Sequence, residues 1–85
     1  MPYIKQEDRK RFEQWKITDI VHLVDCAGDL NYLLTSFIHE YIKIEGESYA
    51  TYNEVIGVLE CAKMELYRRK ISIYEDEKIK ENGDV

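Results

Sequence analysis

The segment "ELYRRK" is the part of the chain whose residue types are best suited to binding chemistry. It places Arg68, Arg69 and Lys70 in succession, and a guanidinium group binds carboxylate or phosphate through two parallel hydrogen bonds. On a regular helix, three successive residues point in three directions, so no single basic strip is expected. The ordinary interpretation is an ion pair between Arg68 and Glu65, Asp76 or the tail. The alternative is the binding of an anionic ligand.

A nucleotide-sized anion would need further donors and a stacking ring near these arginines. Lys63 lies one or two turns away and Tyr67 lies between them. Asn31 and Tyr32 open the third predicted helix, whose start favours anions through its free backbone N–H groups and dipole. Asn53, in the first turn of the next predicted helix, is the weakest member. The candidate ligand-binding residues are therefore Arg68, Arg69, Lys63, Tyr67, Asn31, Tyr32 and Asn53.

Metal and catalytic chemistry receive less support from the sequence. His22 and Cys26 are four residues apart, a spacing found among metal ligands, but His39 and Cys61 complete a set of four only if the fold gathers them. No catalytic motif is present. Cys61 has apolar neighbours, where a thiol stays protonated and unreactive. We therefore expect no metal, no cofactor and no enzymatic activity.

Length and composition predict one small domain spanning residues 1–85, with 45% hydrophobic residues. A chain this short buries too little apolar surface to be readily stable without a covalent cross-link, a bound metal or oligomerisation. The net charge of −5 argues against general nucleic-acid binding. Residues 1–16 form a charged, mainly basic segment, and residues 75–85 form an acidic tail. Neither a signal peptide nor an apolar membrane span is visible, so a cytoplasmic protein is expected.

Helical periodicity dominates the chain and predicts an all-α fold. The two main helices are expected at about residues 30–44 and 52–80, packed antiparallel, with shorter helices before them at about residues 6–15 and from Thr18. Antiparallel packing brings the start of one helix to the end of the other. Asn31 and Arg68 are therefore expected to share a pocket.

Capping residues set the predicted helix ends. Gly28 is expected to stop the second helix and Gly46 the third, in the position where helices often end in glycine. Asp29 is the predicted N-cap of the third helix. Thr51 and Glu54 have the spacing of a capping box at the start of the long helix.

The long helix has two apolar faces on nearly opposite sides. Both have the alternating three-and-four spacing of a coiled-coil seam. The first face consists of Tyr52, Val55, Leu59, Ala62, Leu66 and Ile73. The second consists of Gly57, Cys61, Met64, Arg68 and Ile71. One face suffices for the third helix, so the second face predicts a homo-oligomer interface, although the short second helix is an alternative cover.

Four segments resemble a small family of uncharacterised proteins found in phages and bacteria. They are "MPYIKQEDR", "GDLNYLLT", "SYATYNEVIGVLECAKMELYRR" and "YEDEKIKENGDV". The resemblance covers most of the chain, is weakest around residues 12–27, and implies a phage or prophage setting. That family has no assigned catalytic or binding residues to transfer. A looser similarity of shape is to short helical phage proteins that oligomerise and sequester cyclic-nucleotide immune signals.

Two function classes follow from these observations. The first is a non-catalytic, oligomeric binding protein that sequesters an anionic nucleotide signal as a counter-defence, in the cytoplasm of an infected or prophage-carrying bacterium. The second is an adaptor or inhibitor that binds a host protein directly through its charged ends and an apolar groove. A purely structural role is a third interpretation of the sequence. No general nucleic-acid or membrane partner is expected.

Overall fold

The computed structural model describes residues 3–85, all of whose regular structure is helical. This confirms the predicted all-α class. The chain forms two units, of which the first ends at Ile44 and the second runs from Glu45 to Val85. Residues 1–2 of the predicted charged segment lie outside the described residues.

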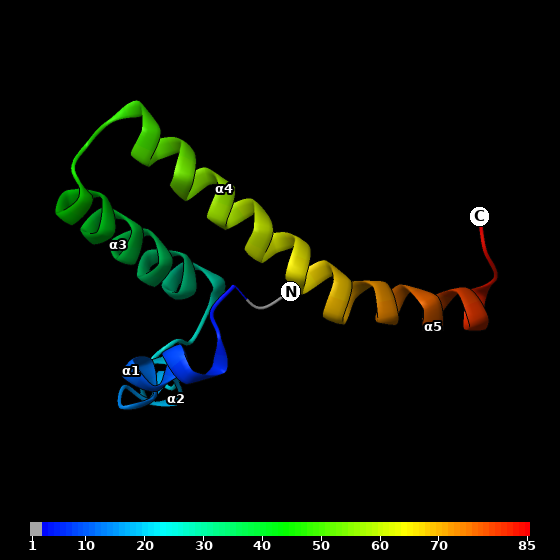
Figure 1. The fold of residues 1–85 in the computed structure, drawn as a ribbon. Helices are drawn as coiled ribbons and strands as arrows, with labels where there is room; N and C mark the ends of the chain where they lie inside the picture. Colours follow the sequence, from blue (N-terminus) through cyan, green and yellow to red (C-terminus); the bar gives the residue numbers. More distant parts are fainter. Residues whose placement is uncertain (1–2) are drawn as a thin grey trace. The chain divides into compact units, whose positions relative to one another are not determined.

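The first unit begins with a 3₁₀ turn, η1 (Gln6–Arg9), that continues into the one-turn helix α1 (Lys10–Glu13). It is followed by the short helix α2 (Ile17–Val21) and the long helix α3 (Ala27–Glu45), all visible in Figure 1. The short helix predicted at about residues 6–15 is thus present as η1 and α1. Helix α2 ends much earlier than predicted, because His22 already forms its C-cap.

The prediction that Gly28 stops the second helix is wrong, because Gly28 lies in the first turn of α3. The α3 ladder begins with Leu30 N–H donating to the Cys26 carbonyl, and the Asp29 carboxylate accepts the Asp25 N–H at 3.0 Å. Asp29 therefore assists the start of the helix from inside its first turn and is not its N-cap. Gly46 does end α3, with a φ of 99° that glycine adopts without strain.

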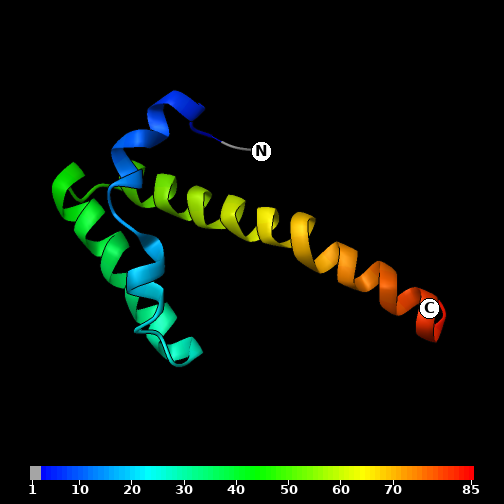
Figure 2. The same cartoon turned by 90° about the horizontal axis from the view of Figure 1, so that it is seen from below.

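The second unit is one unbroken helix built from α4 (Tyr49–Leu66), the π-helical segment η2 (Tyr67–Ile71) and α5 (Ser72–Asn82), as Figures 1 and 2 show. Ser48 is its N-cap, accepting the Thr51 N–H at 3.1 Å. The predicted Thr51–Glu54 capping box is therefore wrong, because Ser48 satisfies the same donor and starts the helix three residues earlier. At the other end, Gly83 follows with a φ of 83°.

Few side chains are buried in either unit. Among residues 3–85, Val55 is the buried hydrophobic residue and Thr51 the buried polar one, and no large side chain is fully buried. A lone helix has no interior, so the second unit depends on something outside itself to cover its apolar residues. The predicted antiparallel packing of the two long helices stays a prediction.

Candidate functional site

Arg68, Arg69 and Lys70 line one hollow of about 520 Å³ together with Ile73. The sequence predicted that these three cations point in different directions and make no single basic strip. They lie in the π-helical segment η2, where successive residues also point in different directions, so this stays a prediction although all three border the hollow. A π-turn adds a residue to one turn of the helix and changes which neighbours share a side.

Ser72 supports this turn with two hydrogen bonds. Its backbone N–H donates to the carbonyl of Tyr67, five residues earlier, where an α-helix would use Arg68. The Arg68 carbonyl instead accepts the Ser72 hydroxyl at 2.9 Å. This back-bond supplies Arg68 with a replacement partner for the missing N–H donor, a role that serine can take inside helices.

The π-turn also changes the predicted apolar faces. Ile73 was predicted to continue the first face beyond Leu66, yet it lines the hollow with Arg68. Ile71, predicted on the second face, lies within the turn itself. The residues of the second face that precede the turn, Gly57, Cys61 and Met64, keep their regular spacing in α4.

Glu65 binds both arginines of the hollow. Its carboxylate accepts Arg69 Nε at 2.6 Å and lies 4.0 Å from Arg68 Nη1. Of the three ion-pair partners that the sequence offered for Arg68, namely Glu65, Asp76 and the tail, Glu65 is the one that lies within reach. Both arginine side chains are more than half exposed, so these pairs contribute little to stability. Arg68 and Arg69 share this one carboxylate, and Lys70 forms no ion pair with the described residues.

Lys63 and Tyr67, two further candidates, are engaged elsewhere. Lys63 Nζ lies 3.3 Å from a Glu60 carboxylate oxygen, and neither Lys63 nor Tyr67 lines the hollow. The Tyr67 hydroxyl donates to Glu75 at 2.9 Å, which ties the π-turn to α5. Tyr67 thus links the turn to α5 and does not contact the hollow.

The Tyr67–Glu75 contact has a measurable consequence. The hydrogen bond to Glu75, and then its negative charge, raise the pKa of Tyr67 above the ordinary value of 10.0. A raised pKa means that the contact stabilises the fold below pH 10 and loses that effect as the pH rises through the folded-state pKa. We expect Glu75→Gln to lower the Tyr67 pKa in part and Glu75→Ala to lower it further, in a pH titration of the ring by NMR. An unchanged midpoint in both variants would contradict the contact.

The candidates Asn31, Tyr32 and Asn53 lie one turn deeper in their helices than predicted. Because α3 starts at Ala27 and α4 at Tyr49, each of the three residues lies beyond the first turn of its helix. Backbone N–H groups beyond the first turn already donate to carbonyls of the same helix and are not free to bind an anion. The Asn31 side-chain oxygen accepts the Thr35 hydroxyl at 3.1 Å. The helix-start argument for these residues is therefore wrong, and a pocket shared by Asn31 and Arg68 stays a prediction.

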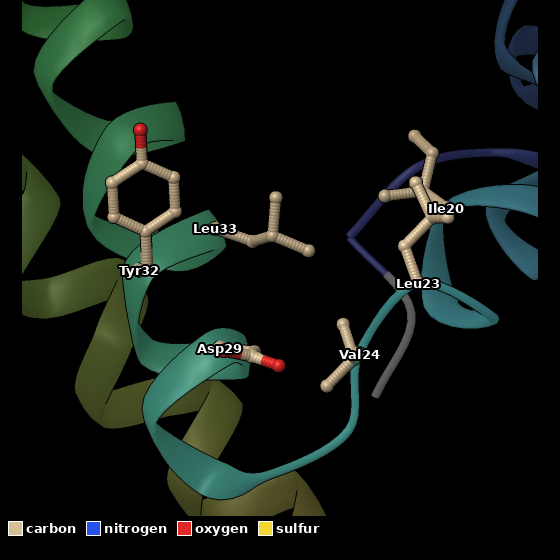
Figure 3. Close-up of a pocket in the computed structure, with 6 residues that line it drawn as sticks. All are labelled: Ile20, Leu23, Val24, Asp29, Tyr32 and Leu33. Carbon is tan, nitrogen blue, oxygen red and sulfur yellow. The ribbon is translucent and has the colours of Figure 1, made fainter.

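Tyr32 instead borders a second hollow, which lies within the first unit (Figure 3). In Figure 3, Leu33 points from α3 toward the segment that carries Ile20 and Val24, and the Asp29 carboxylate lies at one side. This cavity of about 260 Å³ is mainly apolar. Its lining residues are Ile20, Leu23, Val24, Asp29, Tyr32 and Leu33.

The structure separates two of the four residues that were considered as metal ligands. His22 is the C-cap of α2 and Cys26 precedes α3, so the two do not share a helix face. Within residues 3–85, no three His, Cys, Asp or Glu side chains gather in a way that would hold a metal ion. Both Cys26 and Cys61 are free thiols, Cys26 being exposed and Cys61 half-buried.

The fold and the hollow together define a small all-α protein with a cationic site on a π-turn. Across residues 1–85, the chain matches the family described as a domain of unknown function, DUF6899, and it belongs to that family. No curated protein and no solved structure matches it. In the part of the chain that the structure describes, no helix combines the length and apolarity needed to span a membrane.

Proposed function

We propose that this protein is a non-catalytic binding protein that captures an anionic, phosphate-bearing ligand, a nucleotide signal, at the hollow of η2. The observation that carries the proposal is that Arg68, Arg69 and Lys70 all border one hollow. A guanidinium binds a phosphate through two hydrogen bonds, and lysine adds a mobile charge. Binding of this kind needs no catalytic group.

The contacts of Glu65 support an anion in this place. Its carboxylate already occupies Arg69 Nε at 2.6 Å, so the guanidinium is oriented for an oxyanion before any ligand arrives. A phosphate carries more charge and more acceptor oxygens than a carboxylate, and it can engage Lys70 as well. The Ile73 side chain offers an apolar contact for the remainder of a nucleotide.

A single exposed hollow binds weakly, and we propose that assembly strengthens it. Water competes with every hydrogen bond at an exposed site, and pockets that hold small ligands tightly enclose most of the ligand surface. A homo-oligomer formed through Gly57, Cys61 and Met64 would bring further copies of the cationic hollow into one particle. The scarcity of buried side chains in residues 3–85 supports such an assembly.

The setting is part of the proposal and is supported by the resemblance of four segments to a family found in phages and bacteria. We propose that the protein acts in the cytoplasm of an infected or prophage-carrying bacterium. Capture of a nucleotide signal there would blunt a host defence, which is a counter-defence role.

Native mass spectrometry of protein purified gently from infected cells tests this function. We expect an added mass of nucleotide size on the wild-type protein, released by high salt because the contacts are ionic. Arg69→Ala, purified in parallel, should carry less of it. A co-purifying bacterial protein with no small molecule would instead support the adaptor function, and an empty wild-type protein would contradict ligand capture.

A further inference from the structure

Helix α4 is apolar on all sides along its middle. Residues 55–59 are five successive nonpolar residues, which together surround a helix completely. Ile56, Val58 and Met64 each expose more than 60% of their surface. A helix that is apolar all round is normally buried on all sides, and one neighbouring helix covers only one of them. The remaining sides require another partner.

Gly57 marks one side as a place of close approach. A glycine inside a helix costs about 1 kcal/mol relative to alanine. A Cβ added at Gly57 would meet nothing within 4 Å, so nothing in the described chain requires glycine there. A glycine is required there if the backbone of another helix packs against this position, because any larger side chain would hold that backbone away. Cys61, the next small residue on the same side, is half-buried and extends the close surface by one turn.

The charges along the helix identify the partner as a second copy. Residues 49–62 contain two glutamates, Glu54 and Glu60, and neither lysine nor arginine, whereas residues 63–70 contain four cations and only Glu65. Two copies aligned in parallel and in register would place like charges together. Two antiparallel copies that cross between Gly57 and Cys61 would place each basic stretch beside the acidic stretch of the other, because residue numbers then run in opposite directions.

We propose that α4 pairs with α4 of a second copy, antiparallel and around a two-fold axis level with residue 59. Gly57 then packs against Cys61 of the second copy, in both directions as two-fold symmetry requires. Arg68 then lies level with residue 50 of the second copy, about one turn from its Glu54.

A competing antiparallel arrangement has its two-fold axis level with about residue 72. It would also pair opposite charges, because the basic stretch of one copy would lie beside the acidic tail of the other. That register leaves Gly57 against no partner backbone and the apolar middle of α4 uncovered. The glycine and the exposed apolar residues therefore favour crossing at residue 59.

Cysteine cross-linking tests the register without any ligand, so its outcome is separate from that of the proposed anion capture. In a Cys26→Ser variant, Cys61 is the sole thiol, and two copies should place their Cys61 residues about 6 Å apart along the axis, at 1.5 Å per residue. A short bis-maleimide should then produce a covalent dimer at micromolar protein concentration. As the matched control, Ile71→Cys in a Cys26→Ser, Cys61→Ser background places its thiols about 36 Å apart along the axis, and no dimer is expected.

Each outcome of this experiment bears on the proposal. Cross-linking at residue 61 and not at residue 71 is the expected result. Cross-linking at both positions would show parallel pairing, and cross-linking at residue 71 alone would show crossing near residue 72. Either of these results, or no cross-linking at either position, would overturn the proposed pairing.

Discussion

A Gly57→Leu variant is expected to sediment as a monomer at micromolar concentrations where the wild-type protein is an oligomer. A leucine at this position would hold two helices apart at their point of closest approach, and we expect the dissociation constant to rise by about tenfold or more, equivalent to about 1.4 kcal/mol. The same leucine has open space within the chain itself. Because leucine also favours helix over glycine, the helix content should not fall.

Lys63→Leu is the matched control for this variant. It adds the same side chain to the same helix about 120° around the axis from Gly57, at about 100° per residue, and it removes only the exposed ion pair with Glu60. We expect Lys63→Leu to sediment like the wild-type protein. An unchanged oligomer in Gly57→Leu would show that this face is not the interface.

Arg69→Ala is expected to weaken binding of a phosphate-bearing ligand by about tenfold to about a hundredfold. A hydrogen bond to a charged group contributes about 1.5–3 kcal/mol, and each 1.4 kcal/mol is tenfold in affinity. Arg69 suits this test because it lines the hollow but lies off the proposed pairing face. Isothermal titration calorimetry would measure the loss, and sedimentation would show that assembly is unchanged.

Two further variants separate geometry from charge in this prediction. Arg69→Lys keeps the positive charge but loses the planar fork, so its affinity should fall between those of the wild type and Arg69→Ala. Lys80→Ala removes a charge from α5 outside the hollow and should change affinity little. Equal effects of Lys80→Ala and Arg69→Ala would indicate general electrostatic attraction and no defined site.

The sequence predicted the helical class well because its apolar spacing is regular. The stripe that includes Leu30, Phe37 and Tyr41 lies in α3, and the glycine at position 46 ends that helix as expected. Errors concentrated at helix starts, where several polar residues compete for the same backbone donors. Ser48 and Thr51 can both cap a helix, and local spacing alone does not decide which of them does so.

The cationic residues were predictable in type but not in arrangement. Arg68, Arg69 and Lys70 border one hollow within a π-turn, and no pattern in "LYRRKIS" predicts such a turn. The one available signal is Ser72, a residue that can bond a carbonyl four positions earlier and so accommodate an irregular turn. The contribution of Ile73 to the hollow could not be predicted, because it depends on the rotation that this turn introduces.

The most direct test of the central claim is calorimetric titration of the wild-type protein with a panel of linear and cyclic nucleotides, with inorganic phosphate as the minimal anion. Anion capture at η2 predicts that at least one nucleotide class binds at submillimolar concentration or tighter, and that binding weakens as salt is raised. If no member of the panel binds the wild-type protein at submillimolar concentration, the proposed nucleotide capture is contradicted and direct binding of a host protein becomes the better account.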